Sequence, residues 1–120
     1  MHMESKLDWH SYVSRNGGHI APILYAEYRE LKEVHGIGVA KEIIRFRLAQ
    51  LPEILKVAAE ENVMEESQCR EVQAFDVFHD KGLYGEAKAM LAEYEKDMPS
   101  EGSLFQVHEG GEAISVSNYE

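Results

Sequence analysis

The chain has 120 residues, of which 44% are hydrophobic, so it is long enough for one domain with a moderate core and is not disordered throughout. Its formal net charge of −10 disfavours nucleic-acid binding, because an acidic surface repels phosphates and the densest basic group is only Arg45 with Arg47. A single cysteine, Cys69, excludes an internal disulfide and gives no zinc-ligand spacing.

The sequence contains no segment that would insert into a membrane or direct secretion. No stretch approaches the roughly 20 consecutive apolar residues that a membrane-spanning helix needs. The N-terminus, MHMESKLDWH, lacks the apolar run of a signal peptide. We therefore expect a soluble, cytoplasmic protein that binds neither membranes nor nucleic acid.

Residues 1–14 show no sustained hydrophobic period, which indicates an irregular lead-in. They are followed by RNGGHIAP at 15–22, where two adjacent glycines can take positive φ and let another molecule approach the main chain. Pro22 suits the first position of a helix. Free N–H groups at such a helix start favour an anion such as a phosphate, and Arg15 would add a full charge. The same pattern is also typical of a plain turn.

Three segments have apolar residues at the spacing of amphipathic helices, namely 22–35, 39–61 and 83–97. In the second segment the apolar stripe keeps its face across Pro52, which predicts either one kinked helix or two helices broken near Leu51. We expect Gly36 to cap the first helix and Pro99 to stop the third.

Two segments between and after the helices favour strands. Residues 69–79, CREVQAFDVFH, are rich in β-branched and aromatic types and end before Gly82, and LFQVH at 104–108 follows an expected loop at 100–103. The order helix–helix–strand–helix–strand predicts an α+β fold. Because two short strands alone are marginal in water, this pattern indicates a fragment of a larger fold.

Few side chains suggest chemistry on their own. The nearest mixed cluster of possible metal ligands is Asp76, His79 and Asp80, and nothing in the spacing makes them converge, so we expect no metal site. Cys69 has no histidine base close in sequence except His79, which favours an inert thiol over a nucleophile. We expect no catalytic residue on this chain.

Five sequence blocks occur in the order RNGGHI, AKEIIRFRLAQLPEIL, EESQCREVQAFDVFHD, EAKAMLAEYEKDMP and FQVHEGGEA. This series, from Arg15 to Ala113, resembles fungal FAD-dependent oxidoreductases of the D-amino-acid oxidase-like superfamily, such as gamma-glutamylputrescine oxidase. The resemblance implies a partial oxidoreductase domain over residues 15–113, preceded by the lead-in at 1–14 and followed by a tail at 114–120.

The resemblance also implies a cofactor and the residues beside it. In that family the RNGGH segment lies against FAD, which places five residues near the cofactor: Arg15, Asn16, Gly17, Gly18 and His19. Such enzymes take a hydride from a C–N bond of an amine or amino acid, and the flavin carries that chemistry. Residues 1–14 contain no glycine, so the GxGxxG turn that holds the nucleotide is missing, and the likeness stops before the family's catalytic region.

Two functions are therefore expected as alternatives. The first is a truncated or partial FAD-dependent oxidoreductase that cannot hold FAD or catalyse alone. A separate possibility is that the reading frame is incomplete, in which case an upstream in-frame GxGxxG would restore an enzyme. The second is a small acidic helical interaction module without enzymatic activity. In that module, exposed apolar helix faces would bind a partner or self-associate.

Overall fold

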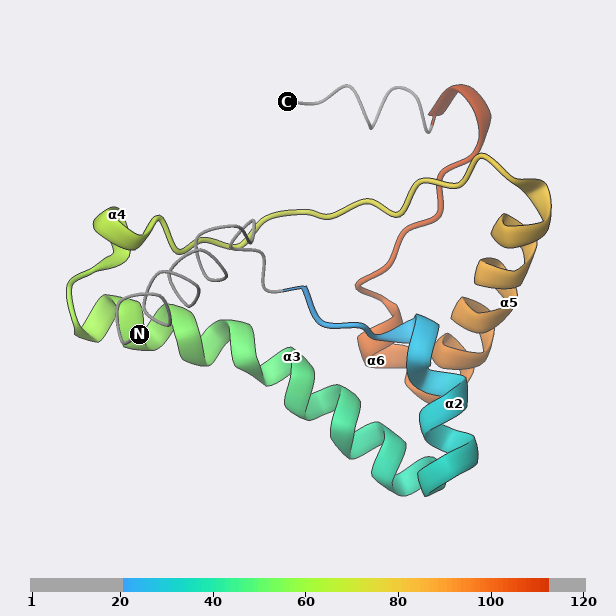
Figure 1. The fold of residues 1–120 in the computed structure, drawn as a ribbon, viewed down its shortest axis with the longest axis horizontal. Helices are drawn as coiled ribbons and strands as arrows, with labels where there is room; N and C mark the ends of the chain where they lie inside the picture. The colour runs from blue at the N-terminus through green and yellow to red at the C-terminus, as the bar shows by residue number, and fades with distance from the viewer. Residues whose placement is uncertain (1–20, 113–120) are drawn as a thin grey trace, which may run out of the picture.

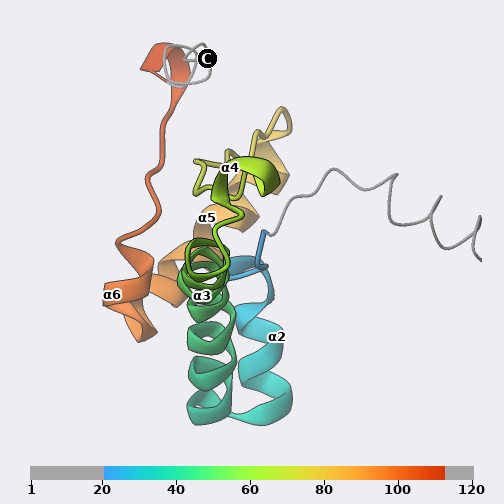
Figure 2. The ribbon, with the colours of Figure 1, turned by 90° about the vertical axis from the view of Figure 1, so that its left-hand side faces the viewer.

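The computed structural model describes residues 21–112, and the expectations for 1–20 and 113–120 lie outside that range. The elements follow in the order α2 (Tyr25–His35), α3 (Ile37–Glu60), α4 (Met64–Ser67), α5 (Lys81–Asp97) and α6 (Pro99–Gly102). Helix α2 packs against both α3 and α5, and α6 packs against α5 (Figure 1). Figure 2 shows α2 and α3 side by side as a helical hairpin.

Gly36 makes the turn between α2 and α3. Its φ of 83° lies in the region that glycine adopts without steric cost, and its N–H donates to the Lys32 carbonyl at 2.9 Å. The expected C-cap is therefore confirmed. The start of this helix was predicted too early, because α2 begins at Tyr25 rather than at Pro22.

Helix α3 continues through Pro52 without a break, so the single-helix alternative is the one that the structure adopts. Proline lacks the N–H that would bond to the preceding turn, which normally weakens a helix interior. Leu48, Leu51 and Leu55 are half-buried on both sides of the proline, and their burial offsets part of that loss. The helix ends at Glu60, close to the predicted end.

The hydrophobic core lies where the first half of α3 meets α2 and the end of α5. Aromatic rings form its centre: Tyr28 and Tyr94 meet edge to face with ring centroids 5.5 Å apart, and Phe105 packs on Tyr94 at 5.8 Å. This geometry suits the charge distribution of aromatic rings. The buried members of the core are Tyr28, Ala40, Ile44, Leu91, Tyr94 and Met98.

The predicted α+β class is wrong. Helix accounts for 68% of the described structure, and residues 21–112 contain no strand. Both expected strands, 69–79 and 104–108, are irregular, and Figure 1 shows the first as an open stretch between α4 and α5. A strand requires a neighbour that supplies its hydrogen-bond ladder, and residue type alone does not provide one.

The ends of the third helix also differ from expectation. Gly82 does not close a strand but lies in the first turn of α5, after Asp80, whose carboxylate accepts the Leu83 N–H at 2.9 Å. This is the usual role of aspartate at a helix start. The expected loop at 100–103 is largely helical, because Pro99 begins α6 directly after α5 ends.

Candidate functional site

The residues predicted to contact a cofactor lie before the described range and have no structural account here: Arg15, Asn16, Gly17, Gly18 and His19. The helix after them has no side-chain cap at its N-terminus, where Leu24 is the capping residue. Their proximity to FAD stays a prediction.

The other side chains considered from the sequence do not converge. Within residues 21–112, no group of three or more His, Cys, Asp or Glu side chains could hold a metal ion. Asp76 instead accepts the Tyr25 hydroxyl at 2.8 Å, and Asp80 caps α5. Cys69 is half-buried and its thiol is free. Its backbone N–H donates to the Ser67 hydroxyl at 3.3 Å.

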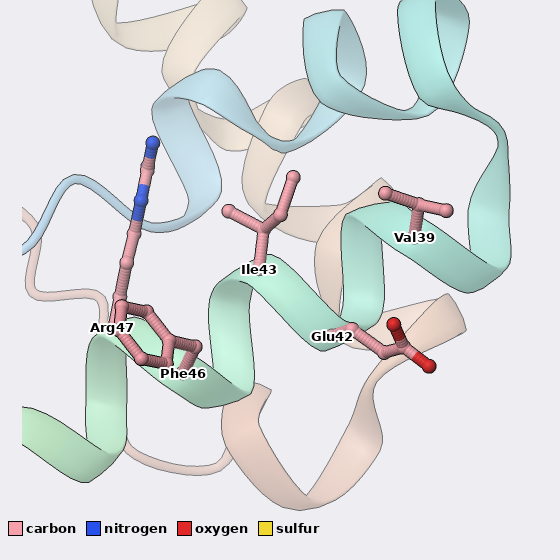
Figure 3. A pocket seen from close by; sticks show the side chains of 5 residues that line it. All are labelled: Val39, Glu42, Ile43, Phe46 and Arg47. Atoms are coloured by element: carbon pink, nitrogen blue, oxygen red, sulfur yellow. The ribbon is translucent and has the colours of Figure 1, made fainter.

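An exposed apolar surface lies on the first half of α3. Its side chains line an open hollow of about 580 Å³ and are shown in Figure 3: Val39, Glu42, Ile43, Phe46 and Arg47. We call these five residues the α3 face. Phe46 is 69% exposed and Val39 46% exposed, although both are large apolar side chains. Apolar surface that is exposed and rimmed by charges is typical of a protein contact site.

The apolar residues of the α3 face follow a coiled-coil spacing. Val39, Ile43 and Phe46 are separated by four and three residues, which is the alternation of a seam that packs on another helix. The amphipathic pattern predicted for residues 39–61 did not distinguish Phe46 as part of a second apolar face. The four-then-three spacing of Val39, Ile43 and Phe46 places them on a different side of α3 from the buried Ile44. That spacing is the sequence signal for a second apolar face on this helix.

Arg47, the cation at the edge of the α3 face, is held in place by hydrogen bonds to α2 and to the residues before it. The Arg47 guanidinium donates to the Glu27 carboxylate at 2.8 Å and to the Ile23 carbonyl at 2.5 Å. Figure 3 shows this side chain extending toward α2. On the other side of Phe46, Glu42 is exposed. The α3 face therefore has an apolar centre between one fixed cation and one carboxylate open to water.

A second group of charges, the α2–α5 ion-pair cluster, consists of Arg29, Lys32, Glu93 and Asp97. Lys32 contacts Glu93 at 2.5 Å and Asp97 at 2.9 Å, and Arg29 contacts Glu93 at 2.6 Å. The hydrogen bonds from Lys32 hold the pKa values of Glu93 and Asp97 below their usual range and raise the pKa of Lys32. These charges satisfy one another, so the cluster ties α2 to α5.

Tyr28 extends the α2–α5 ion-pair cluster into the core. Its hydroxyl donates to the Asp97 carboxylate at 2.9 Å. Burial of the ring, helped by that carboxylate, raises the pKa of Tyr28 to about 12. The hydroxyl therefore stays protonated at neutral pH and acts as a hydrogen-bond donor within the structure.

The hollow on the α3 face does not fit an FAD site. A flavin dinucleotide carries a pyrophosphate, which proteins bind with clustered backbone N–H groups or free cations. The hollow on the α3 face is lined by a single helix, and its cation, Arg47, is bonded to Glu27 and Ile23. We therefore assign no step of flavin chemistry to the α3 face.

None of the helices within residues 21–112 combines the length and the apolar composition that crossing a bilayer requires. No family model matches the sequence, and neither the curated proteins nor the solved structures gave a match.

Proposed function

We propose that this chain is a partial FAD-dependent oxidoreductase of the D-amino-acid oxidase-like superfamily that neither holds FAD firmly nor catalyses alone. The observation that carries the proposal is the ordered series of five sequence blocks from RNGGHI to FQVHEGGEA. The substrate class that belongs to the resemblance is an amine or amino acid.

The contact with the cofactor would be made by the stretch before α2. The backbone of Gly17 and Gly18 would approach FAD most closely, because neither glycine carries a Cβ. Arg15, Asn16 and His19 would lie beside it. When bound in a complete enzyme, the flavin supplies hydride acceptance from a C–N bond. This chain would contribute contact surface to the cofactor and no acid or base.

The first test is to mix purified full-length chain with FAD and separate them by gel filtration. We expect flavin absorbance to elute apart from the protein, with weak binding detectable only by titrating FAD fluorescence. That weak binding should decrease several-fold in Gly17→Ala and stay unchanged in Gly38→Ala, the same substitution at a glycine with open space around it. Equimolar flavin eluting with the protein would contradict the proposal of weak binding, and equal effects of the two substitutions would contradict the assigned contact.

The α3 face favours a second function, a small acidic helical interaction module without enzymatic activity. Its spacing of Val39, Ile43 and Phe46 suits an amphipathic helix as the partner, because apolar side chains at the same alternation would pack between them. The net charge of −10 favours a partner helix that carries lysine or arginine beside its apolar stripe.

The second test uses a synthetic amphipathic helix with leucine at the seam positions and lysine at its flanks. We expect saturable binding by calorimetry, unaffected by FAD. Phe46→Asp should weaken it at least tenfold, since truncating a central aromatic anchor typically costs about 2 kcal/mol or more. Val34→Asp is the matched control, because Val34 is 67% exposed at the end of α2 and outside the α3 face. Equal affinities for the two variants would rule out the α3 face as the binding site.

A further inference from the structure

The segment after α6, residues 104–109, is anchored at its start by one aromatic ring. The Phe105 ring lies edge to face with the Tyr25 ring, with centroids 5.2 Å apart, and with the Tyr94 ring at 5.8 Å. Tyr94 is fully buried and Phe105 is half-buried against the core. We call residues 104–109 the strap.

The other end of the strap is anchored by one carboxylate. The Glu109 carboxylate accepts hydrogen bonds from the Tyr84 hydroxyl at 2.8 Å and from the Lys88 ammonium at 2.7 Å. Tyr84 and Lys88 lie in the first half of α5, whereas Tyr94 lies near its end. The strap therefore runs back along α5, antiparallel to the helix (Figure 1).

The spacing of the two anchors requires an extended strap. Lys88 and Tyr84 lie about 9 Å and about 15 Å along the α5 axis from Tyr94, at a rise of about 1.5 Å per residue. The four residue steps from Phe105 to Glu109 span about 13 Å when extended. An extended segment whose aromatic residue precedes its carboxylate by four positions therefore reaches both anchor points.

Between its anchors the strap is weakly attached. Leu104 is 65% exposed and Val107 is 46% exposed. Gln106 and Val107 make no backbone hydrogen bond with another residue of the range 21–112. The Lys88 and Glu109 side chains are exposed to water, where an ion pair contributes little to stability. A segment with few buried contacts and a solvated backbone opens locally while the rest of a protein stays folded.

The groups that hold the strap are themselves held by contacts that do not involve it. Tyr25 donates its hydroxyl to Asp76 at 2.8 Å, and Tyr94 belongs to the buried core. The Lys88 ammonium lies over the Tyr84 ring, 5.3 Å from its centroid. Departure of the strap would therefore leave a preformed site, with a place for a ring between two tyrosines and a place for a carboxylate beside a cation.

We propose that the strap is releasable and that it covers a peptide-binding site. It detaches from α5 as a unit while the helices stay folded, and the vacated site binds an extended peptide with an aromatic residue followed four positions later by a carboxylate. The strap has this pattern in Phe105 and Glu109, so in the closed chain it occupies the site and excludes the peptide. The proposal uses neither the α3 face nor flavin binding.

The first experiment measures release of the strap by limited digestion of the full chain with chymotrypsin. In Glu109→Lys, which places two cations together, we expect the bond after Phe105 to be cleaved several-fold faster than in the unmodified chain, with cleavage after Tyr94 unchanged. The matched control is Glu112→Lys, beyond the strap, which should cleave like the unmodified chain. Equal acceleration at both bonds, or no acceleration after Phe105, would overturn release of the strap as a unit.

The second experiment measures binding of a fluorescent synthetic peptide, SLFQVHEGG, by anisotropy. We expect at least tenfold tighter binding to the full chain carrying Glu109→Lys than to the unmodified chain, because the native strap competes. Binding should be lost when the peptide's phenylalanine or glutamate is replaced by alanine, and when Lys88→Gln is added to the chain.

Circular dichroism of each variant checks that the helices remain. No binding to the Glu109→Lys chain with its helices intact would overturn the peptide site, and so would equal binding of the native and alanine-substituted peptides. Loss of helix in Glu109→Lys would overturn the claim that the strap leaves while the helices stay folded.

Discussion

At the scale of single residues, Gly102 sets how closely α6 approaches α5. A Cβ at this buried position would lie 2.9 Å from the Glu95 Cα and 2.7 Å from its Cγ. The first of these contacts is with backbone, which cannot rotate away. We expect Gly102→Ala to lower the free energy of unfolding by about 1–3 kcal/mol, the usual cost of overpacking. Urea denaturation followed by circular dichroism measures this change.

Gly85 provides the matched control for that prediction. It lies inside α5, and a Cβ there meets nothing within 4 Å. Gly85→Ala should therefore raise the free energy of unfolding by about 0.5–1 kcal/mol, because alanine loses less conformational entropy in a helix than glycine. If both substitutions changed stability in the same direction and by the same amount, the close approach at Gly102 would not explain the result.

At the scale of elements, the long helices were predictable because the apolar pattern that indicates a helix lies within one short stretch of sequence. Leu48, Leu51 and Leu55 repeat with the helical period, and a helix satisfies its own backbone within four residues. The boundary between α2 and α3 was predictable from Gly36, because a glycine cap depends only on the backbone of the preceding turn. The short helices α4 and α6 were missed, since four residues are too few to show a period.

The strands failed because a strand depends on a neighbour that the sequence does not reveal. Val72, Phe75 and Val77 have strand-forming side chains, and yet no segment within residues 21–112 pairs with them. The α3 face likewise has one property that the sequence indicates and one that it does not. The α3 face could have been found from the spacing of Val39 and Phe46, whereas their exposure depends on which face α2 covers, and that is a tertiary property.

At the scale of the whole molecule, the α2–α5 ion-pair cluster makes stability depend on acidity. The pKa values of Glu93 and Asp97 are lowered in the folded chain from ordinary values of 4.5 and 3.8. A lowered pKa means that the folded state favours the charged carboxylate, so the stabilisation is present above those ordinary values. It is lost as the pH falls through the lower values of the folded state.

We therefore expect the melting temperature to be nearly constant above about pH 5 and to decrease steadily as the pH falls below about 4. The double variant Glu93→Gln with Asp97→Asn should be less stable at neutral pH and should lose less stability on acidification. The control is Glu53→Gln with Glu60→Gln, two exposed carboxylates on α3, which should keep the acid dependence. A control that flattened the profile as much as the cluster variant would contradict this account.

The placement of the core at one end of α3 has a consequence for how the chain tolerates change. The core contacts of this helix come from Ala40, Ile44 and Leu48, and Pro52 lies one turn beyond them. The outer half of α3 still buries Ala58, so its tolerance of change is confined to exposed positions such as Glu53 and Lys56. A label attached at one of these positions would be separated from the tyrosine rings.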